Sequence, residues 1–435
     1  MVLEKDERIS ILRKISQRKR IKIYLVGGFI RDCLLGRLPV DMDYIVEKDA
    51  EKIAQEFAQK IRGKFIIMGK PPKTSYRVAA RGNIIDFVDA VDGILVNDLS
   101  KRDFTINAIS LEINSWKLFD PFKGIEDIDN KIIREVSPQS LKDDPIRILR
   151  AVRYAATIED MKIDDETYFH MVKESPNIID CAFERFAEEV NKMFLSFNPH
   201  RGITLLIRTR LIANIFCSLM SEKEFNMASI EQDEDKFIRE ILPQIKNASE
   251  SEEYRDILRP FEKAKALWIS ALLIFYLDKF DSHITKIKKI LKHMRFSAKD
   301  VSRIYNVVAG TLELCDIAKE EIVDDDKLKL FIGKWGKDFV VMQNLFEGLY
   351  LLKGISEEKK KKTSERLASI FIDDGERLLS PPNLVNGNDV KKILGMDESG
   401  TKIGMVLKKI RELQFIGRIK NREEALEFIR KNAGT

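Results

Sequence analysis

Two aspartates separated by one residue, Asp41 and Asp43, have the chemistry and spacing of a site for a divalent cation. On a β-strand both side chains would point to the same face, because successive side chains alternate between faces. Mg²⁺ takes a few carboxylate oxygens and keeps its other positions for phosphates and water. An Asp-X-Asp pair in a turn is more often only solvated, so the surrounding residues decide between the two interpretations.

A glycine pair precedes these carboxylates. Gly27 and Gly28 follow a short apolar segment and open a segment with helical spacing, after which the chain turns and enters the acidic strand. Glycine lets the backbone approach a ligand closely, and the first amides of a helix attract phosphate groups. Arg31 would add a forked guanidinium to the same anion. Residues 24–46 therefore predict a site for a metal-bound nucleoside triphosphate, whereas a dinucleotide site would need the G-x-G-x-x-G spacing that this segment lacks.

Asp86 is the candidate for a third carboxylate. It lies within the apolar segment IIDFVDA, which has the composition of a strand. Where two metals assist phosphoryl transfer, a third acid commonly helps to hold the metal that activates the attacking hydroxyl. Asp89 is the alternative, and on a strand it would point to the opposite face. We expect Asp86 to be the ligand, because its neighbours place it in mid-strand.

A second group of candidates lies about a hundred residues later, in the segment DDPIRILRAVRYAAT. Asp144 occupies the position of a helix N-cap, and Arg147, Arg150 and Tyr154 share one face of the predicted helix. Cytosine and adenine present an exocyclic amine beside a ring-nitrogen acceptor, whereas uracil and guanine present a carbonyl beside an N–H. A carboxylate beside a guanidinium would pair with the first two bases and leave unpaired groups with the others. The alternative interpretation is a capped amphipathic helix with a solvated basic face.

Five segments between about residues 22 and 195 resemble, in order, motifs of the class II tRNA nucleotidyltransferase and bacterial poly(A) polymerase family, within the polymerase-beta-like nucleotidyltransferases. They read LVGGFIRDCLLGRLPVDMDYIV, KRDFTINA, DPFKGIEDIDNKIIREVSP, DDPIR and FERFAEEVNKMF. The chain departs from the family at Lys101, where the family has arginine, and at Asp143, where it usually has glutamate. The resemblance implies an α+β fold, with a polymerase-beta-like nucleotidyltransferase head (a mixed sheet with helices) followed by an all-helical neck, body and tail.

The resemblance also implies which residues of the head bind magnesium and the triphosphate. Two magnesium ions would be held by Asp41, Asp43 and Asp86. The triphosphate would be seated by Gly27, Gly28 and Arg31. The sugar and phosphates of the incoming nucleotide would be contacted by Arg102 and Asp103, with Asn107 in its motif position.

The residues that would select the base come from two later helices. By resemblance, Asp144 and Arg147 would read the base edge, and Glu184 and Arg185 would orient this pair. The remaining nucleotide-binding candidates are Arg150 and Arg153. On the second of these helices, we expect a solvated face formed by Glu188, Glu189 and Lys192.

In function, the resemblance implies a template-independent nucleotidyltransferase that synthesises or repairs the CCA end of tRNA from CTP, and from ATP if it completes the terminus, releasing pyrophosphate. Only 15 residues separate Asp86 from Arg102. Full CCA-adding members usually carry a longer flexible loop there, so this interval favours the CC-adding subtype. A poly(A) polymerase on the same scaffold and a non-catalytic RNA-binding relative are the alternatives.

Charge and composition limit the other classes of protein. Seventy-five Lys and Arg against 70 Asp and Glu give a formal charge of only +5, so RNA binding would depend on a local patch. Four scattered cysteines predict reduced thiols, and isolated histidines without a His-Asp dipeptide argue against an appended metal phosphohydrolase domain. The charged start and the lack of an apolar run near 18 residues predict a soluble cytoplasmic protein without membrane contact. Nothing in the sequence predicts an oligomeric state.

The predicted domain boundaries follow the motifs and a change of pattern near residue 200. We expect a catalytic head at 1–136, a helical neck at 137–200, a helical body at 201–356 and a helical tail at 357–435. Residues 386–435 carry 11 Lys or Arg against 7 acids, so the tail could meet tRNA phosphates through counterion release. This segment also resembles the C-terminal part of family members, which often read PGP where this chain has Glu398-Ser399-Gly400.

Overall fold

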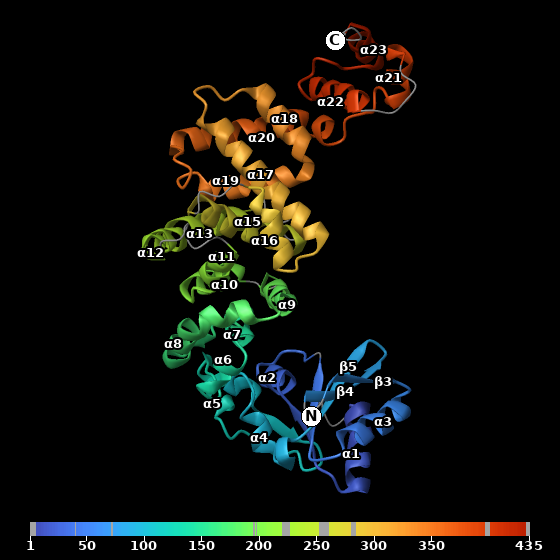
Figure 1. Cartoon of the computed structure of the whole chain (residues 1–435), viewed down its shortest axis with the longest axis vertical. Coiled ribbons are helices and arrows are strands. Elements are labelled where there is room, and N and C mark those ends of the chain that lie inside the picture. Colours follow the sequence, from blue (N-terminus) through green and yellow to red (C-terminus); the bar gives the residue numbers. More distant parts are fainter. Residues whose placement is uncertain are drawn as a thin grey trace. The chain divides into compact units, whose positions relative to one another are not determined.

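The computed structural model describes residues 6–39, 41–70, 73–194, 196, 198–219, 227–251, 261–279, 284–395 and 401–431. The chain divides into two compact units, residues 1–218 and 219–435. The described part of the first unit combines a mixed sheet with helices, and that of the second is helical (Figure 1). The expected α+β class is confirmed, and the four expected domains, with their three boundaries, remain predictions.

The sheet lies in the first unit. Among the described residues it has seven strands in the order β3-β4-β5-β2-β1-β6-β7. Their bounds are β1 Ile23–Val26, β2 Met42–Val46, β3 Lys64–Lys70, β4 Lys73–Ala80, β5 Asn83–Asp89, β6 Ser110–Glu112 and β7 Leu118–Phe119. β2 and β5 run parallel, whereas the other neighbouring strands run antiparallel. The strand predicted at IIDFVDA is β5.

The register of β2 and β5 makes two of the predicted carboxylates neighbours. Asp43 pairs with Asp86, and Met42 pairs with Ile85. Asp41 lies one residue before β2, so the expectation that both aspartates of the Asp-X-Asp pair lie on the strand is wrong for Asp41. The physical reason is that the pairing of β2 with β1 already ends at Asp43, where β1 gives way to the glycine turn.

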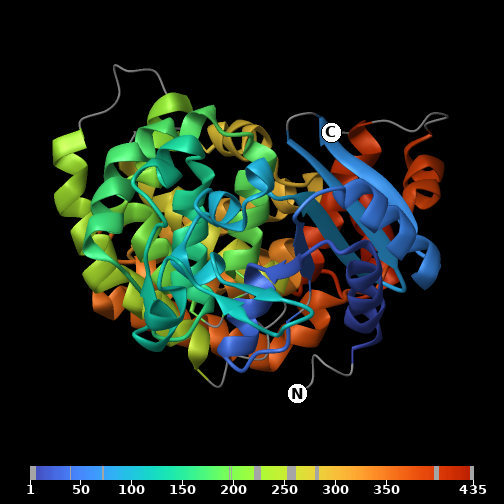
Figure 2. The same ribbon diagram turned by 90° about the horizontal axis from the view of Figure 1, so that it is seen from below.

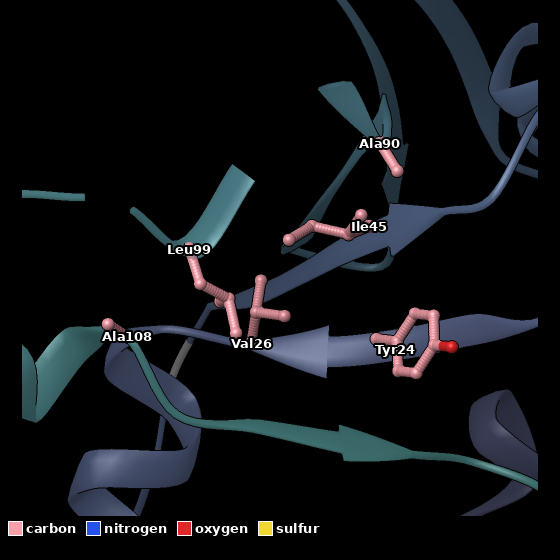
Figure 3. Close-up of a cluster of buried hydrophobic side chains, with 6 residues drawn as sticks. All are labelled: Tyr24, Val26, Ile45, Ala90, Leu99 and Ala108. Atoms are coloured by element: carbon pink, nitrogen blue, oxygen red, sulfur yellow. The ribbon is translucent and has the colours of Figure 1, made fainter. Parts of the chain in front are cut away.

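One face of β1 and β2 packs on the loops that follow β5. The buried apolar cluster on this face consists of Tyr24, Val26, Ile45, Ala90, Leu99 and Ala108 (Figure 3). Ile45 and Asp43 point to the same face, because they are two residues apart on one strand. Leu99 closes helix α4 (Leu95–Leu99) just before the KRDFTINA segment. The cluster therefore anchors this segment beside the carboxylates.

Two helices, α1 (Glu7–Lys19) and α3 (Ala50–Ile61), cover the opposite face (Figure 1). The side chain of Asp6 caps α1 by accepting from the amide of Arg8 at 2.8 Å. The apolar residues of α3 recur at helical spacing and are buried, and Phe57 contacts the ring of Phe87 on β5 at 5.6 Å between centroids. Figure 2 shows the strands as blue arrows beside the dark blue α1 in the view from below.

Short elements on either side of β6 and β7 in the chain are held together by close backbone packing. They are a 3₁₀ turn (Thr105–Asn107), α5 (Gly124–Asp129) and β8 (Ile132–Ile133), which pairs in parallel with β9 (Lys162–Ile163). A Cβ at Gly124 would lie 2.1 Å from the Thr105 carbonyl oxygen, so only glycine permits this approach. Thr105 also donates to Asp127 at 2.6 Å. These contacts fix the position of Asn107.

The remaining helices of the first unit follow in order along the chain. Their bounds are α2 Gly28–Leu34, α6 Gln139–Asp143, α7 Ile146–Thr157, α8 Asp165–Glu174, α9 Phe183–Phe194, α10 Pro199–Arg208 and α11 Leu211–Leu219. α7 packs against α9 and α10. The predicted base-reading helix and the FERFAEEVNKMF helix are thus α7 and α9, in direct contact.

The second unit consists of helices in its described part. Their bounds are α12 Met227–Lys236, α13 Leu242–Glu250, α15 Phe261–Lys279, α16 Lys286–His293, α17 Ala298–Lys319, α18 Asp325–Trp335, α19 Phe339–Leu349, α20 Glu357–Leu379, α21 Gly387–Leu394, α22 Thr401–Phe415 and α23 Arg422–Lys431, with a π-helical turn at Phe237–Ile241. The apolar run LWISALLIFYL is the buried part of α15, which packs on α17 and α19. The charge run at 357–366 begins α20, and Glu398-Ser399-Gly400 lies outside the described residues.

Two further expectations from composition can be compared with the structure. All four cysteines are free thiols, as predicted. Among the described residues no single helix is long and apolar enough to cross a membrane, and α10 and α11 reach that length only together, across a 64° bend.

Candidate active site

The glycine turn brings the backbone against two charged side chains. Gly27 has φ +75°, a conformation that favours glycine, and its amide donates to the Ile109 carbonyl at 3.3 Å. A Cβ on Gly27 would lie 3.3 Å from the Arg102 guanidinium and 3.9 Å from the Asp43 carboxylate. Glycine at this position therefore leaves open a space that is bounded by one cation and one carboxylate.

Negative charge is concentrated around Asp43. Burial raises the pKa of Asp43; Arg102 opposes this, while Asp86 and Asp41 raise the pKa further. Asp86 is tied to Arg77 on the neighbouring strand by two hydrogen bonds of 2.8 Å each. Asp89 instead accepts from the Ala50 amide at the start of α3, at 2.8 Å. Of the two alternatives for a third carboxylate, the structure places Asp86 beside Asp43.

The donor set fits a hard cation. Asp41 and Asp43 offer carboxylate oxygens, and the pKa of Asp43 is raised first by burial and then by the nearby Asp86 and Asp41, whose negative charge a cation would neutralise. Within the described ranges no group of three carboxylate, histidine or cysteine side chains is close enough to hold one metal ion. Asp86 forms an ion pair with Arg77. Of the three predicted metal ligands, only Asp41 and Asp43 have no ion-pair partner within the described part of the chain.

Arg31 and Asn107 connect the glycine helix to the KRDFTINA segment. The Arg31 Nη1 donates to the Asn107 side-chain oxygen at 2.7 Å, and its Nε and Nη2 donate to Asp32 at 2.9 and 2.7 Å. Arg31 is only 9 % exposed. Much of its hydrogen-bonding capacity therefore serves the protein itself.

Asp103 is buried, with one carboxylate oxygen hydrogen-bonded and the other in an ion pair. One oxygen accepts from the Asn107 amide at 2.9 Å and from the Phe104 backbone at 2.8 Å, and the other pairs with Arg150 Nε at 2.9 Å. Burial alone would raise the pKa of Asp103, but Arg150 and these hydrogen bonds outweigh it and hold the pKa below its usual range. The carboxylate, 6 % exposed, thus holds Asn107 and Arg150 in place.

Tyr154 lies at the centre of the basic side chains. Its hydroxyl accepts from Asn107 at 3.1 Å and from Arg150 at 3.0 Å. The guanidinium carbons of Arg31 and Arg153 lie 4.9 and 4.1 Å from the centre of its ring. Burial raises the pKa of the phenol, and the surrounding guanidiniums more than offset this, so the pKa lies below its usual value. The tyrosine therefore joins α7 to both earlier motifs.

Asp144 is held by α9. Its two oxygens accept from Arg185 Nη1 at 3.0 Å and Nη2 at 2.7 Å. The expectation that Asp144 caps α7 is wrong, because Pro145 occupies the N-cap and no side chain caps this helix. The physical reason is that the extended backbone of Asp144 directs its carboxylate toward Arg185 rather than toward the first amides of α7.

Arg147 is tied to the loop before Asp103. Its Nη2 donates to the Lys101 carbonyl at 2.7 Å, and its Nη1 donates to the Arg102 carbonyl at 3.2 Å and to the Ser140 hydroxyl at 2.8 Å. These bonds use at most three of its five N–H groups, which leaves the Nε–H and one Nη2–H for a ligand. Arg147 thus links the base-reading helix to the segment that carries Arg102.

One expected surface residue is buried. Glu189 is 9 % exposed and forms an ion pair with Arg153, so the expectation of a solvated face is wrong at this position. The reason is that α7 packs on the side of α9 that carries Glu189. Glu188 and Lys192 pair with each other at 2.6 Å on the exposed side, as expected.

A cavity of about 350 Å³ gathers most of the predicted site residues. Those lining it are Gly27, Gly28, Arg31, Asp41, Asp43, Arg102, Asp103, Asn107, Asp144, Arg147, Arg150 and Arg153. Three predicted residues do not line it: Asp86, Glu184 and Arg185. Two of these residues nevertheless neighbour residues that line the cavity. Asp86 is paired with Asp43 in the sheet, and Arg185 is hydrogen-bonded to Asp144.

Three other lining residues, Phe29, Asp32 and Lys101, were not predicted as site residues, and Tyr154 was predicted only to share a helical face with Arg147 and Arg150. Tyr154 carried a signal, because it lies seven residues after Arg147 and so on the same helical face. Asp32 and Phe29 carried none, because their contribution depends on how α2 turns toward the KRDFTINA segment.

Two protein families match separate parts of the chain. The family described as "Poly A polymerase head domain" matches residues 23–134. The family described as "Probable RNA and SrmB-binding site of polymerase A" matches residues 160–222. Together they cover the sheet and several helices of the first unit.

Curated relatives align along nearly the whole chain. A CC-adding tRNA nucleotidyltransferase of Synechocystis sp. is 27% identical over 409 residues, covering 93% of this chain and 92% of its own length. A CCA-adding enzyme of Streptococcus agalactiae is 25% identical over 446 residues, covering 98% and 97%. Among solved structures, the Thermotoga maritima CCA-adding enzyme complexed with tRNA is similar in fold, with a TM-score of 0.65, 22% identity and coverage of 98% and 94%.

Proposed function

Since the chain belongs to the tRNA nucleotidyltransferase and poly(A) polymerase family, we propose that it extends the 3′ end of tRNA with nucleotides from CTP, without a template. The observation that carries this proposal is the cavity that combines Asp41 and Asp43 with the glycine turn, Asp144 and Arg147. Relatives named as CC-adding and CCA-adding enzymes, aligned over more than nine-tenths of the chain, support it.

In the proposed reaction, the terminal 3′-hydroxyl of the RNA attacks the α-phosphate of the nucleotide. The hydroxyl loses its proton and a new P–O bond forms to the RNA, while the bond between the α-phosphorus and the oxygen bridging to the β-phosphate breaks, so that pyrophosphate leaves. Asp41 and Asp43 would hold Mg²⁺, which when bound supplies positive charge for the phosphates and the attacking oxygen. Positioning and charge neutralisation would provide most of the rate.

The cationic side chains of the cavity have distinct proposed tasks. Arg102 lies beside the glycine turn and is the nearest cation to the space that Gly27 leaves open. Arg31 has most of its donors engaged by Asn107 and Asp32, so we assign it mainly to orienting α2 against the KRDFTINA segment. Asp103 likewise acts through Arg150 and Asn107 rather than on the nucleotide.

Base selection would fall to Asp144 and Arg147. Arg185 uses one acceptor position on each oxygen of Asp144, and each carboxylate oxygen has a further lone pair for an exocyclic amine. Arg147 can offer its Nε–H to a ring nitrogen. A base with the reversed pattern, uracil or guanine, would leave these groups unpaired.

The interval between Asp86 and Arg102 supports the CC-adding subtype. After β5 it consists of a 3₁₀ turn at Val91–Gly93 and the five-residue helix α4, and every one of its residues is described. Such short elements leave no room for a long flexible loop. The relatives include both CC-adding and CCA-adding enzymes, so the subtype rests on this interval.

The test is incorporation of labelled CTP or ATP into tRNA ending before the CCA, after one C, and after CC. We expect C addition to the first two RNAs and no A addition to the third. Asp41→Ala/Asp43→Ala should abolish incorporation, whereas the exposed control Glu159→Ala/Asp165→Ala should retain it. No incorporation into any RNA would overturn the proposed function, and A addition to tRNA-CC would overturn only the subtype. Long tails made from ATP alone on unrelated RNA would identify a poly(A) polymerase instead.

A further inference from the structure

A second cavity lies in the first unit, on the α1 and α3 side of the sheet. Its volume is about 390 Å³, against about 350 Å³ for the candidate active site. The first turn of α1, the last turn of α3 and the turn between β4 and β5 form its walls. Ile85 lines this cavity, and the next residue, Asp86, points to the other face beside Asp43. The two cavities therefore belong to opposite faces of one sheet.

Positive side chains dominate the rim of the second cavity. Lys60, Arg62 and Arg81 are exposed, and within the described part of the chain their side chains have no hydrogen bond or ion pair. Arg8, in contrast, is held by Asp6 at 2.6 Å and donates to Asn83 at 3.2 Å. Four cations face two acids, Asp6 and Glu7, so the lining carries two excess positive charges.

The floor of this cavity is apolar. Ile85 is 1 % exposed, and Ile11, Ile61 and Ala80 are half-buried around it. A simple inorganic anion would use the rim alone. A ligand with a phosphate group and a flat apolar part would use both the rim and the floor.

We propose that this cavity is a second nucleotide site. Arg62, Arg81 and Lys60 bind the phosphate, and the base lies on the apolar floor around Ile85. The free carboxylate of Glu7 is the acceptor available to the ribose hydroxyls. The nucleotide is either a free mononucleotide or one residue of an RNA strand, since both present the same phosphate, sugar and base.

The variant that tests the site is Arg62→Ala/Arg81→Ala. Its matched control is Arg20→Ala/Lys22→Ala, because Arg20 ends α1 in the same left-handed conformation as Arg62 at the end of α3, with φ 55° in both, and lies outside the cavity. Both variants remove two exposed positive charges. Equal thermal unfolding midpoints for the two would show that any difference in binding is not a folding defect.

Calorimetric titration with ATP and magnesium, without RNA, gives the number of nucleotide sites. We expect two sites in the unsubstituted protein and in the control, and one in Arg62→Ala/Arg81→Ala. Fluorescence anisotropy with a 12-nucleotide single-stranded RNA tests the other source. A loss of RNA affinity of about tenfold or more in this variant alone, with one ATP site throughout, would assign the site to an RNA residue.

Equal ATP stoichiometry and equal RNA affinity in the variant and the control would overturn the proposal. Incorporation of CTP into tRNA, measured on the same preparations, separates this result from the proposed function. The substituted arginines lie on the other face of the sheet from Asp43, so failure of the second site leaves the first intact.

Discussion

Arg185 holds Asp144 by two parallel hydrogen bonds, from Nη1 at 3.0 Å and from Nη2 at 2.7 Å. Arg185 comes from α9 and does not line the active-site cavity, whereas Asp144 does. The bidentate geometry fixes the plane of the carboxylate. The orientation of the proposed base-reading acid is therefore set by a helix that itself stays outside the cavity.

Replacing Arg185 should loosen base selection more than stability. In Arg185→Ala we expect kcat/KM for CTP to fall about tenfold to a hundredfold, because a misplaced positioning group can cost that much. The preference for CTP over UTP should fall as well. The pair is half-exposed, so its loss should change the free energy of unfolding by less than about 1 kcal/mol. Incorporation assays with each nucleotide measure the first two effects.

Lys192→Ala is the control on the same helix, since Lys192 pairs with Glu188 on the exposed side of α9. It should leave both kinetic values unchanged. Arg185→Lys keeps the charge but loses the fork, so it should restore only part of the CTP preference. An unchanged ratio of CTP to UTP in Arg185→Ala would contradict the positioning role.

Removing the hydroxyl of Tyr154 should destabilise the first unit. Tyr154→Phe leaves the donors of Asn107 and Arg150 without their shared acceptor in a buried position. We expect a loss of about 1–3 kcal/mol in the free energy of unfolding, measured by urea denaturation. Tyr168→Phe is the control, because its hydroxyl bonds to the Arg208 carbonyl at an exposed position. Equal losses of unfolding free energy in the two variants would show that the buried hydrogen bonds of the Tyr154 hydroxyl do not stabilise the first unit.

The sequence was sufficient where chemistry and backbone conformation coincide in one short segment. The glycine turn at Gly27 and Gly28 and the strand that carries Asp43 were predicted from the order strand, glycine turn and strand within about 20 residues. The spacing of Arg147 and Tyr154 on one helix was likewise readable. Local periodicity therefore predicted which residues line the cavity better than it predicted the role of each residue.

What the sequence could not predict are the pairings made across long stretches of chain. Arg31 meets Asn107 across 76 residues, and Arg153 meets Glu189 across 36. Such contacts depend on how α2, α7 and α9 pack, and no local pattern encodes them. For this reason Arg31 was predicted as a phosphate ligand although most of its donors serve the protein.

Asp86 and Asp89 should differ in what their removal affects. Asp86→Asn weakens the acidic site beside Asp43, so we expect incorporation to fall by at least about a hundredfold with little change in stability. Asp89→Asn weakens the bond to the Ala50 amide at the start of α3, so it should cost about 1 kcal/mol of unfolding free energy and leave the rate nearly unchanged. Thermal unfolding and CTP incorporation on the same two proteins distinguish them. The reverse pattern would make Asp89 the third carboxylate.

The ion pair between Asp103 and Arg150 should give the stability a defined dependence on acid pH. Burial raises the pKa of Asp103, but Arg150 and Asn107 outweigh this and lower it below its unfolded value. A depressed folded pKa means that the carboxylate contributes its full stability above about pH 4 and loses it as the pH falls through the folded pKa. In Asp103→Asn the buried Arg150 has lost its charge partner, so we expect a cost of about 3–5 kcal/mol near neutral pH.

The difference between wild type and Asp103→Asn should therefore be constant from about pH 7 down to about pH 4 and shrink below that. Urea unfolding at a series of pH values measures this difference directly. Glu126→Gln serves as the control, because Glu126 pairs with Lys123 at an exposed position of the same unit, where the pair contributes little. A difference for Asp103→Asn that stayed constant below pH 4, or one as small as the control's, would mean that the ionised form of Asp103 is not what stabilises Arg150, Asn107 and the cavity they line.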